Sequence, residues 1–394
     1  MLVTRIAALS GQDGVKGDRA HMADLCHRLD APPPAEDARW HALDAGAWQL
    51  RWERHSEFSS WTFQRRPSGD ESNGAEVEAP SDWLSGLPGP VMVLTTVRVR
   101  RGHHGDVPTV ERHNAIGTRL LGGAATLHTD MKPDAAGMTR FNLVVHDEDP
   151  VLTGRIVLAL LEIETYRLMA LLAFPVAGET AAKLAGLEVE AGALASRIAE
   201  DLGVEDDRAL LTRLVGLSGQ MEALSAATNF RFGAGKAYHD IMLGRIASLR
   251  EEPLPGLQTI GEFMDRRLGP AMRTCVSVAQ RERDVIARIA RAGQMLNTRI
   301  ELVTQAINAD LLKSMDRRAS MQLGLQRTVE GLSVAAISYY VLQLMLYPVA
   351  ALVPTGGRIT REVVIALLLP VVLASVWLLL RRARHRTAHD SLDR

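Results

Sequence analysis

The pattern of hydrophobic and polar positions changes most sharply in the last quarter of this chain. Between Gly331 and Gly357 there is no charged residue, and Leu332–Val353 is an apolar run of about 22 residues. At about 1.5 Å per residue, a helix of this length crosses a hydrocarbon core of roughly 30 Å. A second apolar run, Val363–Leu380, is about 18 residues long and lies at the lower limit of spanning length. The pattern therefore predicts a two-helix transmembrane hairpin over residues 331–381.

Basic residues flank this predicted hairpin on both sides. They are Arg317, Arg318 and Arg327 before the first run, and Arg381, Arg382, Arg384 and Arg386 after the second. The connecting segment Pro354–Glu362 holds two arginines and one glutamate. Because basic flanks stay on the cytoplasmic side, we expect a cytoplasmic N-terminal part and a basic cytoplasmic tail over residues 382–394, close to anionic lipid head groups. The alternative interpretation is a buried helical hairpin in a soluble core.

Alternation with a period of two dominates residues 1–150 and predicts an α+β sheet domain. The expected strands are Leu2–Leu9, a pair within Ala47–Arg65 with Trp48, Leu50 and Trp52 on one face, Pro90–Arg100, Ala124–Asp130 and Thr139–His146. A short helix is expected over Arg19–Leu29, and Pro67–Pro80 is rich in loop-forming residues. The sequence thus predicts five or six strands with one or two helices.

Helical periodicity dominates residues 151–330 and predicts a stalk domain. The expected helices are Gly154–Phe174, ended or kinked by Pro175, Ala181–Asp201, Arg208–Phe232, Lys236–Arg250, and a long helix from Leu257 that is interrupted at Gly269-Pro270. Apolar residues then repeat at alternating spacings of three and four at Ile286, Ile289, Gly293, Leu296, Ile300, Val303 and Ile307. This repeat predicts a coiled-coil-like seam, whose partners are helices of the same chain or of other subunits in a homo-oligomer.

The composition of the chain limits which kinds of partner it can bind and which cellular compartment we expect for it. The net charge is −1 and charged residues make up 23% of the chain, which gives no basic excess for nucleic acid. The two cysteines, Cys26 and Cys275, are far apart in sequence and suit a reducing compartment better than a disulfide framework. The N-terminus has no long apolar segment followed by a cleavage site, so we expect the bulk of the chain to stay in the cytosol.

Motifs for chemistry are few, and we predict no catalytic residue, cofactor or metal site. GAGK (Gly233–Lys236) lacks the frame of a phosphate-binding loop and is followed by alanine. His103-His104 with Asp106 follows a predicted strand and could hold a metal, but an exposed polar turn explains it better. Glu164 and Arg167 are spaced for an ion pair, which we prefer over paired-carboxylate catalysis with Glu162. Arg231 and Arg266-Arg267 could dock an acidic lobe or be solvated.

The first predicted span carries a face of small and polar residues. Ser333, Tyr340 and Tyr347 are spaced by seven, and Ala336 and Gln343 lie near the same face. In an oligomer this face could line a pore or bury polar contacts between helices, but ordinary helix packing and interfacial tyrosines explain it better. Glu330, at the cytoplasmic mouth of the span, is either an interfacial charge or part of a cation-attracting ring.

Three long blocks of the sequence resemble a bacterial family known as domain of unknown function 3422. They are ALLEIETYRLMALLAFPVA (Ala159–Ala177), GLQTIGEFMDRRLGPAMRTC (Gly256–Cys275) and SMDRRASMQLGLQRTVEGLSVAAISYY (Ser314–Tyr340). LRWERHSEFSSWTF (Leu50–Phe63) also matches the family's pattern. The resemblance covers nearly the whole chain and implies a membrane-anchored bacterial protein without an assigned activity. Family members begin earlier, with a Glu-Val-His-Ala-Arg-Pro segment, whereas this sequence opens directly on Leu2–Leu9.

The order of regions also resembles that of CorA-type magnesium channels, which carry Gly-Met-Asn at the outer end of the first span. The corresponding stretch here, Leu344–Gly357, lacks that tripeptide. We therefore expect a non-enzymatic scaffold, sensor or regulatory module in the bacterial inner membrane, bound to the lipid bilayer and oligomeric through its stalk. The alternative function is a CorA-like ion channel or transporter whose first span lines the pore.

Overall fold

The computed structural model of the chain describes residues 1–10, 14–65, 79–102, 116–200, 203–352 and 361–390. It confirms the mixed α+β architecture that the sequence predicts. The chain divides into two compact units, Met1–Leu296 and Asn297–Arg394, each with its own hydrophobic contacts. Two features named from the sequence fall outside the described residues. They are His103, His104 and Asp106, and the predicted loop Pro67–Pro80 except for its last two residues.

The described part of the first unit contains a nine-stranded sheet in the order β2-β3-β4-β1-β5-β8-β7-β6-β9. Its strands are β1 (Leu2–Leu9), β2 (Trp40–Asp44), β3 (Trp48–Arg54), β4 (Phe58–Arg65), β5 (Val91–Arg101), β6 (Ile116–Leu120), β7 (Ala125–Pro133), β8 (Thr139–Val145) and β9 (Glu252–Pro253). All neighbours pair antiparallel except β5 and β8, which are parallel. The expectation of five or six strands was too low, because β2, β6 and β9 are too short to show a clear alternation.

The two faces of the sheet pack against different helices. On one face α1 (Gly14–Arg28) and α2 (Ser81–Ser85) cover a tryptophan-rich cluster that includes Trp52, Trp61 and Trp83. On the other face α3, α5 and α6 cover the aliphatic side chains of the central strands. β1 is buried on both faces, as its burial pattern from Val3 to Ala8 shows. The predicted common face of Trp48, Leu50 and Trp52 is confirmed, since all three lie in the tryptophan-rich cluster.

Six further helices follow along the chain. They are α3 (Pro150–Leu171), α4 (Ala173–Ala199), α5 (Gly203–Ser248), α6 (Ile260–Arg267), α7 (Gly269–Leu352) and α8 (Arg361–Asp390). α3 begins where the Asp149 side chain accepts a hydrogen bond from the Val151 amide. α6 begins with a capping box, in which Thr259 and Glu262 bond reciprocally.

Proline and glycine affect these helices in different ways. The predicted break at Pro175 is confirmed: proline has no N–H to donate to the carbonyl of Leu171, and α3 ends at that residue. The predicted separation of Arg208–Phe232 from Lys236–Arg250 is wrong, because α5 runs through both. Gly233 and Gly235 only weaken helix propensity, and packing of the α5 surface on the neighbouring helices outweighs that cost.

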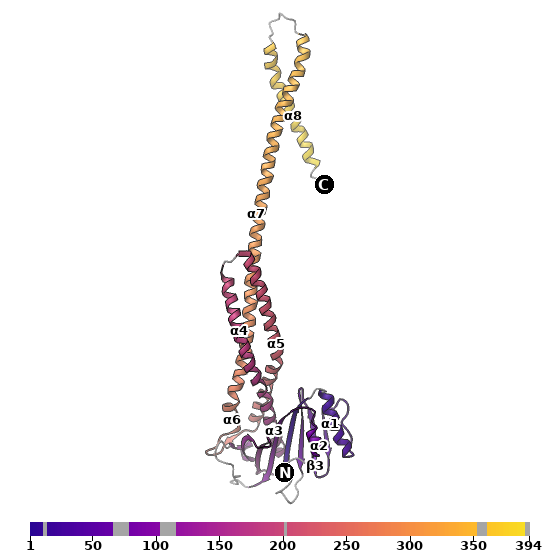
Figure 1. Cartoon of the computed structure of the whole chain (residues 1–394), viewed down its shortest axis with the longest axis vertical. Helices are drawn as coiled ribbons and strands as arrows, with labels where there is room; N and C mark the ends of the chain where they lie inside the picture. Colours follow the sequence, from indigo (N-terminus) through magenta and orange to yellow (C-terminus); the bar gives the residue numbers. More distant parts are fainter. Residues whose placement is uncertain (11–13, 66–78, 103–115, 201–202, 353–360, 391–394) are drawn as a thin grey trace. The chain divides into compact units, whose positions relative to one another are not determined.

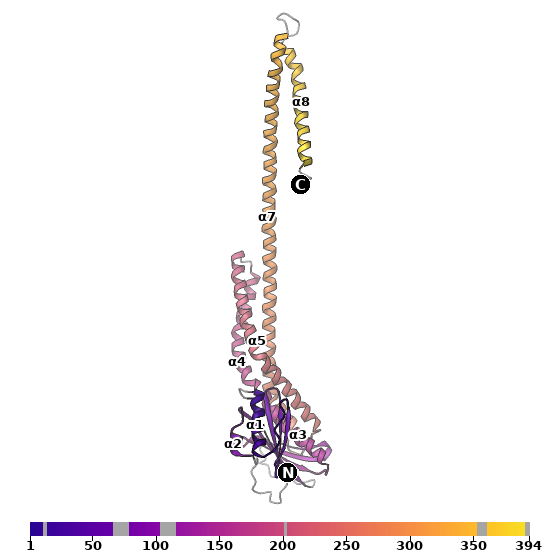
Figure 2. The ribbon, with the colours of Figure 1, turned by 90° about the vertical axis from the view of Figure 1, so that its right-hand side faces the viewer.

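The first part of α7 packs against α4 and α5, and Figures 1 and 2 show the three helices side by side. Ala173 and Ala177 of α4, Phe232 of α5, and Cys275 and Val278 of α7 form one apolar cluster. Both cysteines are buried free thiols. The partners of this part of the seam are therefore helices of the same chain.

The buried positions on α7 follow the predicted seam only in part. They run through Cys275, Val278, Glu282, Val285, Ile289, Ala292 and Leu296. Ile289 and Leu296 are buried as predicted, but Ile307 is 57% exposed. Packing within this chain therefore accounts for the first part of the predicted seam, and a partner for Ile307 stays a prediction.

In the second unit the end of α7 contacts α8. Leu342 of α7 and Val372 and Val376 of α8 form a small buried cluster, with Val334, Val341, Ile365 and Leu368 packed against it. Pro348 lies inside α7 and Pro370 inside α8.

Candidate functional site

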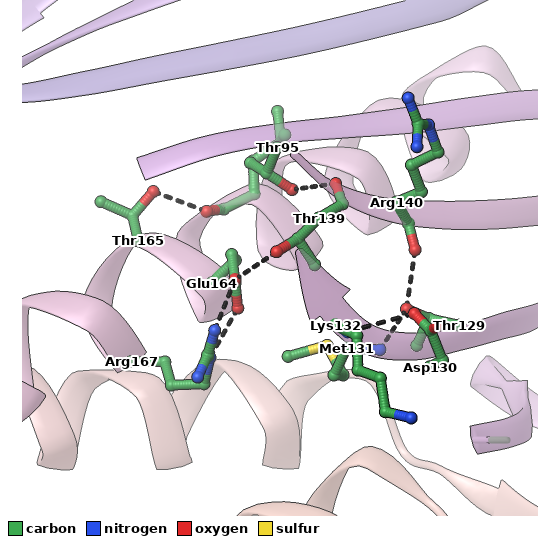
Figure 3. A network of polar contacts seen from close by, with 11 residues as sticks. Thr95, Thr129, Asp130, Met131, Lys132, Thr139, Arg140, Glu164, Thr165 and Arg167 are labelled. Atoms are coloured by element: carbon green, nitrogen blue, oxygen red, sulfur yellow. Dashed lines mark hydrogen bonds and ion pairs between the residues drawn. The ribbon is translucent and has the colours of Figure 1, made fainter. Parts of the chain in front are cut away.

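A buried ion pair on α3 is the centre of a polar network next to a pocket of the first unit (Figure 3). The Glu164 side chain has no exposed surface, and Arg167 binds it through two nitrogens. Nε donates to Oε2 and Nη2 donates to Oε1, both at 2.7 Å. The two residues are one helical turn apart, so α3 itself sets this geometry. The preferred interpretation of Glu164 and Arg167 as an ion pair agrees with this contact.

The sheet supplies the third hydrogen bond to Glu164 and a second threonine that supports it. The Thr139 hydroxyl on β8 donates to Glu164 Oε1 at 2.9 Å, and the Thr95 hydroxyl on β5 donates to the Thr139 carbonyl at 3.2 Å. The carboxylate thus accepts three hydrogen bonds in a region without water contact. A carboxylate can be buried without a large free-energy cost only when its oxygens accept hydrogen bonds in this way.

The opposite side of the network is a β-bulge in β7. The register of β7 with β8 shifts between Thr129 and Pro133, and Met131 has a positive φ of 54°. The Thr129 hydroxyl supports this bend by accepting from the Met131 amide at 3.1 Å and donating to the Arg140 carbonyl at 2.7 Å. The Asp130 carboxylate accepts from the Lys132 amide at 3.1 Å. Left-handed backbone at a methionine is strained, and bulges of this kind re-aim the side chains beside them.

A pocket of about 320 Å³ lies between the bulge, α3 and α6. Its charged lining residues are Asp130, Lys132, Arg167 and Arg267, and its apolar ones are Leu171, Phe263, Met264 and Leu268. In Figure 3 the Arg167 guanidinium points to Glu164, and the Lys132 side chain extends from the bulge away from that pair. The network therefore positions cationic groups beside an apolar wall.

The electrostatics of this site favour charged side chains. Burial lowers the pKa of Arg167, but the Glu164 carboxylate more than offsets that effect, so the pKa is raised from its ordinary value. Within the described part of the chain, the ammonium of Lys132 and the guanidinium of Arg267 have no ion-pair partner. Among the described residues, the pocket thus contains two cationic side chains without an ion-pair partner.

The other charged residues named from the sequence have separate partners. Glu162 pairs with Arg245 of α5 at 2.6 Å, so it does not join Glu164 in a carboxylate pair. Arg231 binds Glu57, and it therefore docks on an acidic group of the sheet. Arg266 donates to the Gln258 side chain at 2.5 Å, whereas its neighbour Arg267 lines the pocket.

The GAGK segment lies in the middle of α5, which agrees with its rejection as a phosphate loop. Lys236 pairs with Asp240 one turn further on, at 2.6 Å. A Cβ atom at Gly235 would lie 2.7 Å from the Cβ of Ala173, so this glycine permits a close approach of α5 to α4. Its role is helix packing.

The predicted face of the first span is exposed in the second unit. Ser333, Ala336, Tyr340, Gln343 and Tyr347 all have exposed side chains. The Ser333 hydroxyl donates to the Val329 carbonyl at 2.9 Å, and the Gln343 amide donates to the Tyr339 hydroxyl at 3.3 Å. Glu330 accepts from the Gln326 amide at 3.2 Å. Each of these polar groups thus makes a hydrogen bond within α7.

The predicted flanking arginines lie on the same two helices. Arg317, Arg318 and Arg327 are exposed on α7, and Arg382 is exposed on α8. Arg381, Arg384 and Arg386 also belong to α8, but their side chains fall outside the described ones.

One helix in the described part of the chain is long and apolar enough to cross a membrane, the stretch Gly269–Met345. A second apolar helical stretch, Ile365–Leu379, is shorter. Core helices of soluble proteins meet the same criterion of length and composition but are mostly buried, whereas 11% of the apolar window is buried here. The described residues contain no group of three potential metal ligands. The fold and site thus define an α+β protein with a small cationic pocket and a long apolar helix.

The family follows from the sequence as a whole. The model of a protein family of unknown function, DUF3422, matches residues 1–387, and the chain belongs to this family. This match confirms the resemblance predicted from the three long blocks. No curated protein and no solved structure matches the chain, and the likeness to CorA-type channels has no support from these comparisons.

Proposed function

We propose that this protein is a non-enzymatic scaffold or sensor, held in the bacterial inner membrane by a hairpin made of the end of α7 and α8. One observation carries this proposal: outside the small cluster of Leu342, Val372 and Val376, many large apolar side chains of both helices are exposed. Leu332, Leu344 and Leu367 expose 74%, 70% and 71% of their surface. Full burial of such a side chain stabilises by about 1.5–3 kcal/mol, and a lipid core would provide it along both helices.

The polar groups of the proposed first span suit an anchor better than a pore. The Ser333 hydroxyl and the Gln343 amide each make a hydrogen bond within α7, which supports an anchor. Pro348 and Pro370 are compatible with this interpretation, since proline is tolerated in membrane helices. The contact of Leu342 with Val372 and Val376 would hold the two spans together.

The part of α7 that precedes the proposed span supports assembly of the chain into an oligomer. Large apolar side chains that this chain does not cover continue along α7 at Leu302, Ile307, Leu311, Leu312, Met315, Met321, Leu323, Leu325 and Val329. A second copy of the same helix would cover them and extend the seam beyond Leu296. The scaffold would then present several copies of the first unit at the membrane.

Reporter fusions test the proposed topology. A phosphatase that is active only outside the cytoplasm, inserted after Gly357, should be active, and the same enzyme after Arg394 should be inactive. A cytoplasm-specific fluorescent reporter at the same two positions should give the reverse pattern. Activity of the phosphatase at both positions, or at neither, would contradict a two-span hairpin.

A flux measurement separates the anchor from the channel. Vesicles containing the purified chain should retain a cation gradient if the hairpin is an anchor. If they leak, and if Tyr340→Ala or Gln343→Leu changes the leak, the channel becomes the better explanation. The matched control is Met345→Ala, an exposed apolar position on the opposite side of the helix from the predicted polar face.

A further inference from the structure

We propose that the pocket between the β7 bulge, α3 and α6 binds a small oxyanion, a carboxylate or a phosphate, that carries a short apolar group. The chain would then be a receptor for an anionic amphiphile as well as a membrane-held scaffold. Three independent features of the described residues converge on this pocket: an oriented guanidinium, a strained bulge and an apolar wall.

Arg167 is the oriented cation. Glu164 takes its Nε and Nη2 donors at 2.7 Å each and has no exposed surface, which fixes the plane of the guanidinium. Nη1 makes no hydrogen bond within the described part of the chain, and 16% of the side chain remains exposed on the pocket. A guanidinium that is held from behind and keeps a donor toward a cavity is pre-organised for an oxyanion.

The bulge supplies the second cation. Met131 adopts a φ of 54° and is only 4% exposed, so its side chain enters the core while its neighbours Asp130 and Lys132 line the pocket. A regular strand would avoid this strain. Thr129 braces the strained backbone by two hydrogen bonds. The bulge thus brings Lys132 to the same pocket as Arg167.

α6 supplies the third cation and most of the wall. Arg267 ends the helix that also carries Phe263 and Met264, and Leu268 and Leu171 complete the apolar surface. Three cationic and two anionic side chains, including buried Glu164, give the site a net charge of +1. This charge suits a monoanion, and the wall suits an apolar group attached to it.

The size of the pocket limits the ligand. A volume of about 320 Å³ is at the small end of small-molecule sites. A short-chain carboxylate or alkyl phosphate fits these limits, whether it is free in solution or part of a lipid with an anionic head group.

The test uses the full chain in nanodiscs of phosphatidylcholine and isothermal titration with hexanoate and hexyl phosphate. At least one anion should bind, while hexanol and hexylamine should not. Lys132→Gln and Arg267→Gln should each weaken binding by about 5- to 10-fold, because each removes a charge-assisted hydrogen bond at a partly exposed site. Both positions are exposed, so these variants keep the buried Glu164–Arg167 pair.

The matched control is Arg266→Gln, which removes the same charge one residue away from the pocket lining. It should leave the affinity unchanged, and Phe263→Ala should reduce the preference for hexanoate over acetate. Failure of both anions to bind, binding of hexanol as tight as hexanoate, or equal losses for Arg266→Gln and Arg267→Gln would overturn the proposal.

A second arm identifies the source of the anion. Adding phosphatidylglycerol to the nanodiscs should raise the apparent dissociation constant for hexanoate if a lipid head group occupies the pocket. An unchanged constant supports a soluble ligand. Neither result bears on whether the hairpin spans the bilayer.

Discussion

The guanidinium of Arg231 on α5 binds both carboxylate oxygens of Glu57, at 3.2 and 2.6 Å, next to the start of β4. Both side chains are largely buried, and the pair ties the helical part of the first unit to its sheet. Tyr238, about two turns after Arg231 on α5, forms a hydrogen bond with the same carboxylate. This contact joins residues that are far apart in sequence and that no local pattern connects.

Removing one partner of this pair should destabilise the first unit. We expect Glu57→Gln to lower the free energy of unfolding by about 2 kcal/mol, because it leaves the Arg231 charge partly buried without a counter-ion. Urea denaturation followed by tryptophan fluorescence measures this, since five of the six tryptophans lie in residues 40–83. Asp240→Asn, which breaks the exposed pair with Lys236, should cost less than about 0.5 kcal/mol. Equal losses for the two variants would contradict the role of Arg231 and Glu57.

The same carboxylate affects the ionisation of Tyr238. Burial and then the hydrogen bond with Glu57 raise the pKa of Tyr238 to about 12 from an ordinary value of 10.0. Glu57→Gln should therefore lower this pKa. Ultraviolet titration of phenolate absorbance, with Tyr238→Phe subtracted as a reference, measures the change. An unaltered titration of Tyr238 would show that Glu57 does not interact with it.

The two glycines of GAGK should respond in opposite directions to alanine. A Cβ at Gly235 would lie 2.7 Å from the Cβ of Ala173, so Gly235→Ala should destabilise by about 1–3 kcal/mol. Among the described residues, a Cβ at Gly233 would have open space around it, and Gly233→Ala should stabilise α5 by up to about 1 kcal/mol through helix propensity. Thermal unfolding of both variants gives the comparison, and a stabilised Gly235→Ala would refute the close approach of α5 to α4.

Acidification should weaken the packing of α1 on α2. His21 stacks on Trp83 with ring centroids 4.3 Å apart, and burial lowers the pKa of His21 below its ordinary value of 6.5. The unfolded chain therefore binds a proton more readily than the folded one, and stability should fall as the pH drops through 6.5 toward the lowered value. His21→Phe keeps the stacking and should flatten the pH dependence of the unfolding free energy between pH 7 and 5. The exposed residue His27 is the control, and His27→Phe should leave the slope intact.

The stalk should determine the oligomeric state. Leu311→Glu and Leu325→Glu introduce charge on exposed apolar positions of α7, so they should lower the mass of the detergent-solubilised complex without changing the fold of the first unit. Multi-angle light scattering of the complex measures the mass. Arg318→Glu, on the same helix, serves as a charge control. A wild-type chain that is already monomeric would contradict assembly through the stalk.

The sequence predicts the long strands well because their residue composition favours strands. Leu2–Leu9 and Val91–Arg101 are rich in residues that favour strands, and both are strands. β9 could not be predicted, since its two residues become a strand only by pairing with Thr118 and Arg119 of β6. Its formation depends on tertiary contacts, so it cannot be predicted from local propensity.

Only part of the candidate site could be predicted from the sequence. Glu164 and Arg167 are one turn apart on a predicted helix, so their pairing follows from helical geometry. Lys132 joins them through a bulge with an unusual φ at Met131, and Arg267 joins them from α6. Neither the bulge nor the approach of α6 has a signature in the spacing of residues, although the turn-rich segment after Asp130 marks an irregularity there.

Extraction of bacterial membranes with alkaline carbonate tests most directly whether the end of α7 and α8 lie in lipid. The full chain should remain in the membrane pellet, whereas a chain that ends at Val329 should be soluble, because it lacks both apolar helices. Release of the intact full-length chain into the carbonate supernatant would contradict the proposed anchor.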